Sequence, residues 1–336
     1  MPDRVSIRDL AKLAGVSRTT VSLALRGSHE VSPATRKKIQ DLASKHDYRS
    51  HPAVNALMQQ VGRGVRVHDE EIIAFIRSGS DPDERAAGPL ELLAGACDEA
   101  HRLGYRIEVF WAGYKGAHAR SLGRVLYNRG IRGVIWSPMP YPHPPIVFPW
   151  EHFAPIACTL SAAVTRLPTV SIHHSKGMAL VLEELTRRGA ARIGFLSEQI
   201  EDSRQDFGWL SGVDIYRHRG GKSDVFPLLP PDLLDEKAFR SWTKCLRLDA
   251  LVLTQNYFDH TAPWAGGIPR VSLDIPTKDL GRVAGLYQDT SQLGRHAVRS
   301  LAIRLANGIL GLPEQPFSVV SQASFVAGKT LKLGNA

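Results

Sequence analysis

Residues 15–25, with the sequence GVSRTTVSLAL, combine small and hydroxyl side chains with one long cation, Arg18. Val21, Ala24 and Leu25 have the spacing of an inward-facing helical stripe. The opposite face then carries Arg18, Thr19, Ser22, Leu23 and Arg26. The major groove of DNA admits a helix with side chains short enough for close approach, provided that a few reach base edges. This stretch therefore predicts a DNA-reading helix, and the alternative is an ordinary helical bundle with a solvated outer face.

Two further helices are expected around this one, because so short a helix needs neighbours to hold it. Residues 6–14 begin with a Ser-x-x-Asp capping pattern and carry apolar residues at helical spacing. Residues 15–16 form a turn, and Ser17 is a good cap for the next helix. A third helix is predicted to start where Ser32 precedes Pro33. We expect the three helices to share one small core.

The positive charge of the chain is concentrated at its N-terminal end. The first 67 residues contain 12 Lys and Arg against 5 Asp and Glu, a net charge of +7, whereas the whole chain carries +9. Phosphate contacts need such a local positive surface, while an evenly solvated surface would not concentrate its charge in this way. A membrane anchor is less suitable, because no long apolar segment accompanies the charge. Nucleic acid is the predicted partner.

These segments resemble the lactose-repressor (LacI/GalR) family of transcription regulators, through IRDLAKLAGVSRTTVSLAL followed by VSPATRKKIQDLASKHDY. The resemblance implies a helix-turn-helix DNA-binding headpiece over residues 1–50. It implies base-edge contacts from Arg18 and Thr19, with Leu23 beside them. Leu23 stands where the family commonly has a polar residue, so it can only pack against a thymine methyl group. The phosphate contacts implied are those of hydroxyl side chains: Ser6, Ser17, Thr20 and Ser22.

Residues 51–69 resemble the family's hinge helix and linker. In the family, a leucine of this helix wedges into the minor groove at the centre of a palindromic site, and that leucine is Leu57 here. Such a wedge unstacks a base step and kinks the duplex. The alternative is a plain flexible linker, which Pro52, Gly62 and Gly64 permit when DNA is absent.

From residue 70 onward, apolar runs typical of buried parallel strands alternate with amphipathic helical patterns. The runs include IIAFI, RIEVFW, GVIW, TVSI, ARIGFL, DALVLT and a final strand, FSVVSQASFVAG. The alternation predicts an α/β domain, and its length suits two doubly wound lobes. The family resemblance implies that 70–336 is a periplasmic-binding-protein-like effector domain. We expect lobe one to cover 70–168 and 289–316, and lobe two 169–288 and 317–333.

Ligands of doubly wound sheets bind beyond the carboxyl ends of the strands. The side chains predicted there are Ser78, Ser137, Arg204, Gln255, Asn256 and Asp274, with Trp111 or Trp209 as stacking surfaces. Amides and carboxylates can bond hydroxyl groups, and an indole can cover the apolar face of a sugar ring. We therefore expect a small-molecule effector, a sugar or sugar derivative, between the lobes. His173 and His174 replace the Asp-Asn pair usual in the family, so the alternative is a DNA-binding or architectural protein without ligand response.

Other chemistry is not expected from the motifs. Adjacent histidines in a strand, as expected for His173 and His174, point to opposite faces, and no Cys-x-x-Cys pair exists, so no metal site is predicted. Cys97, Cys158 and Cys245 lie within apolar patterns and are expected to be buried. The commonest phosphate-binding loop, hydrolase elbow and zinc-protease motifs are absent. No cofactor and no enzymatic activity are expected, and an α/β enzyme with an appended DNA-binding head is the weaker alternative.

The cellular context and assembly follow from the same features. Without a signal peptide or membrane span, the chain is expected in the cytoplasm. One headpiece of about 50 residues offers a small interface, so tight binding needs two heads on a palindromic double-stranded operator. The sequence therefore predicts a homodimeric transcription repressor, held together by its effector domain.

Overall fold

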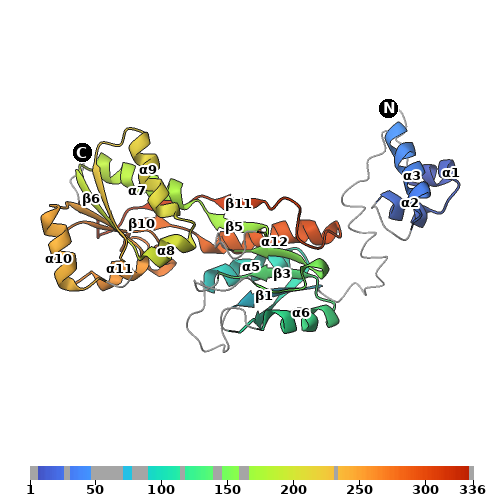
Figure 1. The fold of residues 1–336 in the computed structure, drawn as a ribbon, viewed down its shortest axis with the longest axis horizontal. Coiled ribbons are helices and arrows are strands. Elements are labelled where there is room, and N and C mark those ends of the chain that lie inside the picture. The colour runs from blue at the N-terminus through green and yellow to red at the C-terminus, as the bar shows by residue number, and fades with distance from the viewer. Residues whose placement is uncertain are drawn as a thin grey trace. The chain divides into compact units, whose positions relative to one another are not determined.

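A computed structural model of the chain describes residues 7–25, 31–46, 71–77, 90–113, 118–138, 146–158, 166–230 and 234–332 (Figure 1). The chain divides into two compact units, residues 1–68 and residues 69–336. Among the predicted site residues, Ser6, Leu57 and Ser78 lie outside the described residues, as does the hinge segment 51–69.

The N-terminal unit contains three short helices, α1 (Ile7–Ala14), α2 (Arg18–Leu25) and α3 (Pro33–Lys45). Gly15 ends α1 with a φ of +70°, and the N–H of Val16 donates to the Ala11 carbonyl at 3.1 Å. This is a glycine-dependent helix end that turns the chain into α2 within three residues. The side chain of Ser32 accepts a hydrogen bond from the Thr35 N–H and caps α3. The buried core residues are Leu10, Ala11, Ala14, Val21, Ala24, Val31, Ile39 and Ala43.

The first lobe of the second unit is built on a six-stranded parallel sheet with the order β11-β5-β4-β3-β1-β2. The strands are β1 (Glu71–Arg77), β2 (Tyr105–Trp111), β3 (Gly133–Trp136), β4 (Ala154–Ala157), β5 (Thr169–Ile172) and β11 (Ser318–Ser321). One face packs against α5 (Leu90–Arg102) and α12 (Thr290–Ala306), and the other against α6 (Ala119–Asn128). Both faces of the sheet are thus covered, as parallel sheets require.

The second lobe has a sheet of the order β12-β10-β9-β8-β6-β7, in which only β12 is antiparallel to its neighbour among the described strands. The strands are β6 (Arg192–Leu196), β7 (Asp224–Leu228), β8 (Ala250–Leu253), β9 (Arg270–Ser272), β10 (Ala284–Tyr287) and β12 (Ser324–Val326). The helices are α7 (His174–Arg187), α8 (Gln199–Arg204), α9 (Gly208–His218), α10 (Glu236–Cys245) and α11 (Gln255–His260). Side chains of α7 and α9 pack on one face, and those of α10 and α11 on the other.

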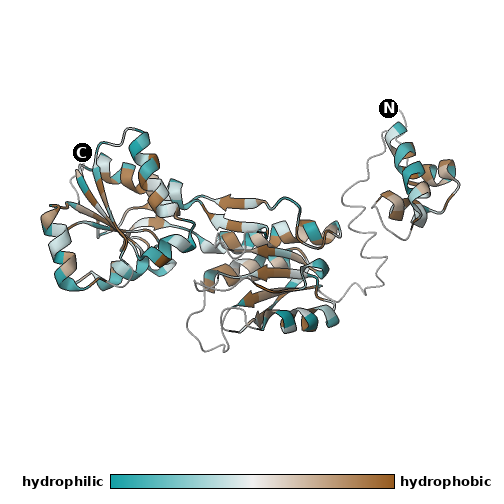
Figure 2. Ribbon diagram, viewed as in Figure 1, coloured by the Kyte–Doolittle hydropathy of each residue, from teal (hydrophilic) through white to brown (hydrophobic). Residues whose placement is uncertain are grey.

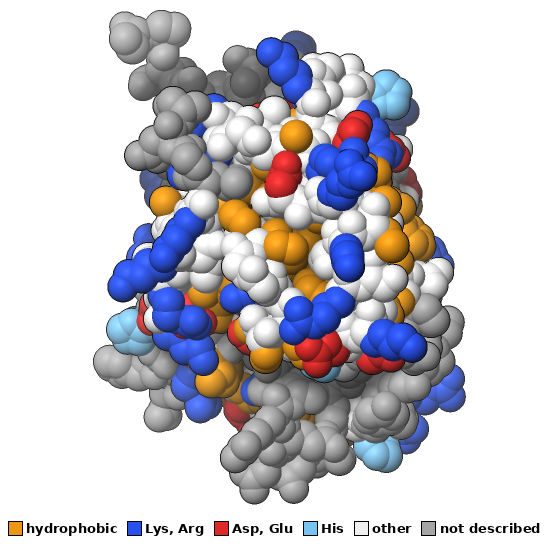
Figure 3. Space-filling model, turned by 90° about the vertical axis from the view of Figure 1, so that its left-hand side faces the viewer, with side chains coloured by type: hydrophobic (Ala, Val, Ile, Leu, Met, Phe, Trp, Pro, Cys, Tyr) orange, Lys and Arg blue, Asp and Glu red, His pale blue; other side chains and the backbone are white. Residues whose placement is uncertain are grey.

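The distribution of hydrophobic residues explains both layered lobes. Figure 2 shows hydrophobic residues concentrated in the strands, while the helices alternate between hydrophobic and hydrophilic residues. The face of the second lobe in Figure 3 mixes Lys and Arg with Asp, Glu and hydrophobic side chains. By sequence count, the first 67 residues carry a net charge of +7 out of +9 for the whole chain.

The chain changes lobes a few residues later than predicted. Thr169–Ile172 pair with β4 and β11, so this segment belongs to the first lobe although it was expected in the second. The predicted single final strand is two strands: β11 pairs with β5 in the first lobe, and β12 pairs with β10 in the second. Two of the three crossings therefore follow Ile172 and Ser321, because backbone pairing rather than apolar pattern decides sheet membership. The third lies between β10 and α12, where it was predicted.

Helices α5 and α12 approach closely because glycines lie at their crossing. A Cβ atom on Gly95 would overlap the carbonyl oxygen of Ser291, and one on Gly294 would overlap that of Leu92. Beside the crossing, the buried Glu99 accepts hydrogen bonds from Arg102 and, at 2.8 Å, from Arg299 of α12. These two guanidinium groups hold the pKa of Glu99 near 2. The crossing thus combines backbone contact with an ion-paired carboxylate.

The prediction for the cysteines is correct for one position and wrong for two. Cys158 is buried at the end of β4, and burial raises the pKa of its thiol to about 12. Cys97 of α5 and Cys245 of α10 are exposed. Both helices are amphipathic, and these two positions lie outside their buried stripes.

Candidate DNA-reading helix and ligand cavity

Helix α2 presents its first residues to solvent. Arg18 and Thr19 are exposed, as the predicted base-contacting role requires. The Ser17 hydroxyl accepts a hydrogen bond from the Thr20 N–H at 3.0 Å and lies 2.8 Å from the Thr20 hydroxyl. Ser17 therefore caps the helix, and its remaining hydroxyl capacity is available to an anion at the helix N-terminus.

Leu23 and Ser22 lie further along the same helix and are half-buried. Leu23 packs against the headpiece core, so part of its side chain is unavailable to DNA. The remaining apolar edge fits contact with a methyl group better than any polar contact.

Several cations surround α2 on the neighbouring helices. Lys38 of α3 donates to the Ala14 carbonyl at 3.1 Å, which satisfies a free carbonyl at the end of α1. The exposed cations of the described headpiece include Arg8, Lys12, Arg18, Lys37 and Lys45. Long exposed cations of this kind are suited to phosphate contacts.

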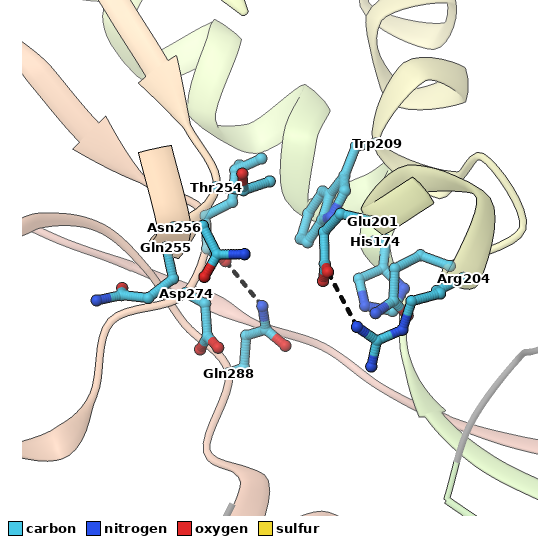
Figure 4. Close-up of a pocket in the computed structure, with 11 residues that line it drawn as sticks. His174, Glu201, Arg204, Trp209, Thr254, Gln255, Asn256, Asp274 and Gln288 are labelled. Atoms are coloured by element: carbon cyan, nitrogen blue, oxygen red, sulfur yellow. Dashed lines mark hydrogen bonds and ion pairs between the residues drawn. The ribbon is translucent and has the colours of Figure 1, made fainter. Parts of the chain in front are cut away.

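The second unit contains a cavity of about 230 Å³ in its second lobe (Figure 4). Its lining residues follow strands β6, β8, β9 and β10 or begin helix α7. They are His174, Glu201, Arg204, Gln205, Trp209, Thr254, Gln255, Asn256, Leu273, Asp274 and Gln288. The cavity thus lies beyond the carboxyl ends of parallel strands, where ligands of such sheets bind.

The structure brings together five of the predicted effector residues, namely Arg204, Trp209, Gln255, Asn256 and Asp274. Ser137 is not among them, because it ends β3 of the other sheet and is buried. Trp111 ends β2 and lies under the Arg77 guanidinium at 5.1 Å. Among the described residues, all those that line the cavity belong to the second lobe.

One wall of the cavity depends on Asp202, a residue that sequence patterns did not indicate. Its fully buried carboxylate accepts hydrogen bonds from the N–H groups of Trp209 at 3.0 Å and Leu210 at 3.3 Å. This contact caps α9 across the turn at Asp206 and Phe207, both of which have a φ of 54°. Burial raises the pKa of Asp202, while the two N–H groups favour its charged form. Asp202 thereby fixes Trp209 in the wall.

The histidines have a different setting from the predicted strand. His173 caps α7, with its ring nitrogen Nδ1 accepting from the Lys176 N–H at 3.4 Å. His174 begins the helix, and its ring meets that of Trp209 edge-on with centroids 4.6 Å apart. Burial lowers the pKa of His174 to about 4, so the ring is neutral at pH 7. The buried Nδ1 of His174 and Oγ1 of Thr254 have no hydrogen-bond partner among the described residues.

Some charged side chains of the cavity have an ion-pair partner and others do not. Arg204 forms an ion pair with Glu201 at 3.1 Å. Asp274 is open to solvent through the cavity yet surrounded by protein, and this desolvation, together with Glu201 and Glu91, raises its pKa to about 6. No cation pairs with this carboxylate among the described residues.

We expect Asp274→Asn to raise the thermal stability of the ligand-free chain at pH 7.5 and to leave it nearly unchanged at pH 4. The folded-state pKa of Asp274 lies above its unfolded value, so the carboxyl favours folding less as pH rises from about 4 through 6. An uncharged amide removes that penalty only where the carboxyl would be ionised. Scanning calorimetry at both pH values tests this, with the exposed Asp214→Asn as the matched control. Equal shifts at the two pH values would contradict it.

The described residues show neither a metal site nor a membrane-spanning helix. No group of three or more His, Cys, Asp or Glu there could hold a metal ion. No helix in the same part of the chain is long and apolar enough to cross a membrane.

The comparisons with known proteins agree on both units. Residues 6–51 match the model of the family described as bacterial regulatory proteins, lacI family. Over most of its length the chain is 19% identical to the HTH-type transcriptional regulator MalR of Streptococcus pneumoniae, an alignment that covers 88% of this chain and 92% of MalR.

Two solved structures share the fold. The lac repressor dimer bound to operator and the anti-inducer ONPF is 18% identical with a TM-score of 0.55, covering 99% of this chain and 100% of that one. The complex of the transcriptional regulator CelR with cellobiose is 17% identical with a TM-score of 0.56, covering 96% of this chain and 99% of CelR. The α/β unit therefore has the two-lobed architecture that the sequence predicted.

Proposed function

We propose that the chain is a DNA-binding transcription regulator of the lacI family, and that it acts as a homodimeric repressor whose operator affinity is controlled by a small molecule. This proposal rests on the presence of two features in one chain. Helix α2 of the first unit has an exposed face, and the second unit has a polar cavity at its strand ends. The dimer of the similarly folded lac repressor supports the assembly. Binding to chromosomal operators would place the protein in the cytoplasm, and no enzymatic role is proposed.

Sequence reading is assigned to α2. Arg18 and Thr19 contact base edges, and Leu23 packs on a thymine methyl group. The hydroxyl groups proposed to bind phosphates are those of Ser6, Ser17, Thr20 and Ser22. Leu57 is proposed as the residue that wedges into the minor groove at the centre of the operator.

We expect Arg18→Ala to weaken operator binding by roughly 1–3 kcal/mol and to leave binding to random DNA nearly unchanged. Arg18 is exposed at the start of α2, so its loss should not disturb the headpiece core. Arg18→Lys is the matched control. It keeps the positive charge but loses the bidentate hydrogen bonding of a guanidinium group. Fluorescence anisotropy at one salt concentration measures both affinities. Equal losses on operator and random DNA would make Arg18 a phosphate contact instead.

The effector is proposed to bind in the second-lobe cavity and to lie between the lobes once they close. Its lining combines amide and carboxylate groups with the indole of Trp209, a set suited to a polyhydroxy compound. A sugar or sugar derivative is the proposed class, and the cellobiose complex of the similarly folded CelR supports it. Ligand closure of the lobes would change the separation of the two headpieces in a dimer and so alter operator affinity.

The test is operator anisotropy of the full chain across titrations with candidate sugars, repeated with Asp274→Ala. We expect one compound to shift operator affinity by about 5- to 150-fold in the parent and much less in the variant. Gln255 donates a hydrogen bond to Asp259 at 2.9 Å, so one of its N–H groups is not free to bind a ligand. This contact favours the alternative, a constitutive DNA-binding protein. Stable binding of a ligand without any change in operator affinity would establish that alternative.

A further inference from the structure

The Asp274 carboxylate is held in place but lacks a hydrogen-bond donor among the described residues. Its main chain is fixed on both sides: the Ser272 hydroxyl accepts from the Asp274 N–H at 3.2 Å and lies 2.8 Å from the Asp274 carbonyl. Gln288 donates to the preceding Leu273 carbonyl at 2.8 Å. Figure 4 shows Asp274 at the cavity, beside Gln288 and Asn256. The Asp274 carboxylate is thus held in position but receives no hydrogen bond from the described residues.

The neighbouring amides are already committed elsewhere. Gln255 donates from Nε2 to the Asp259 carboxylate at 2.9 Å and accepts at Oε1 from the Ser272 hydroxyl at 3.3 Å. Asn256 donates to the Glu198 carboxylate at 3.4 Å. Each of these amides uses one N–H in such a bond and none donates to Asp274, which leaves the carboxylate open to donors from a ligand or from water.

The charges that line the cavity favour a positively charged ligand. Glu201 and Asp274 supply two carboxylates, against the single guanidinium of Arg204, which is already paired with Glu201. His174 adds no positive charge at pH 7, because burial keeps its ring neutral. Glu91 of α5 adds a further negative field at Asp274. The cavity is consequently net negative, and the side chain that most needs a partner is a carboxylate.

We infer that the effector presents a cationic nitrogen to Asp274, as an amino sugar or another amine-bearing polyol does. This inference rests on the proposed function, because it names the ligand class of the same cavity. A protonated amine would give Asp274 the charged hydrogen bonds that the protein does not supply. A uronic acid or sugar phosphate would instead bring a like charge into a cavity whose only lining cation, among the described residues, is already paired.

The test uses the full chain and three matched series: glucosamine, galactosamine and mannosamine, their parent hexoses, and the corresponding uronic acids. Thermal shift finds the binders, and titration calorimetry gives their affinities. We expect a hexosamine to bind more tightly than its hexose, and the uronic acid not to bind. Asp274→Asn should weaken the amine by about 10- to 100-fold, in keeping with the loss of a charged hydrogen bond. The exposed Asp214→Asn should leave the affinity unchanged.

A second variant tests the charge argument in the opposite direction. Arg204→Gln removes the lining cation and should tighten amine binding, so impaired folding cannot imitate the expected result. The inference is overturned if no hexosamine binds, if a hexose or uronic acid binds more tightly than the amine, or if Asp274→Asn leaves amine affinity unchanged. Failure of the proposed function is a separate outcome, in which a compound binds the cavity but operator anisotropy does not respond.

Discussion

Leu10→Ala is expected to unfold the headpiece and abolish operator binding. Leu10 is fully buried in a core shared by three helices of 8, 8 and 13 residues. Truncating a buried leucine costs about 2–5 kcal/mol. A unit of this size has a total stability of only about 2–7 kcal/mol, at roughly 0.05–0.15 kcal/mol per residue. The loss is therefore comparable with everything that holds the headpiece together.

Leu13→Ala provides the control on the same helix, because Leu13 is 52% exposed. It removes the same atoms from α1 without opening the core, so operator affinity should stay within about twofold. Anisotropy measures binding, and amide hydrogen exchange of α1 to α3 reports headpiece folding separately from the second unit. Retention of protected headpiece amides in Leu10→Ala would refute the argument.

The second large effect is expected from Gly95→Leu at the crossing of α5 and α12. Even a Cβ atom at this position overlaps the carbonyl oxygen of Ser291, which belongs to helix backbone and cannot rotate away. Overpacking costs about 1–3 kcal/mol when side chains can yield, and more is expected where backbone must move. The two helices must separate, which opens the core that they form with the first sheet.

Urea denaturation of the full chain measures the loss, followed through the transition of the α/β unit. Cys97→Leu adds similar bulk at an exposed position of the same helix and should change the free energy of unfolding by less than about 0.5 kcal/mol. A Gly95→Leu protein with the parent's denaturation midpoint would show that α5 and α12 can shift without cost.

The elements that the sequence predicted well are those with strong local signals. Ser32 followed by Pro33 marks the start of α3, and the glycine turn at residue 15 separates α1 from α2. Most central strands of the two sheets are continuous apolar runs and were predicted for that reason. Strand β7 was missed because it is an edge strand containing Pro227, and β10 because it is short and includes Gly285.

The cavity could be predicted only in part. Gln255 and Asp274 lie two residues beyond the ends of β8 and β9, so the rule for strand ends located them. Gln288 was missed because it follows β10, a strand that the apolar pattern did not indicate, whereas His174 and Glu201 lie in the first turns of α7 and α8. The capping of α9 by Asp202 likewise spans a turn with two left-handed residues, which no periodic pattern indicates. Their contribution required the three-dimensional structure.

The pairing of β5 with β11 has a consequence for synthesis on the ribosome. Ile172 is made long before Ser318, and at 5–20 residues per second the delay is roughly 7–30 s. Helix α12, which completes the same core, also emerges late. During this interval the apolar edge of the first sheet has no partner strand and is open to aggregation or to a chaperone. The headpiece, whose described helices lie within residues 7–45, can fold and meet DNA before the domain that governs it exists.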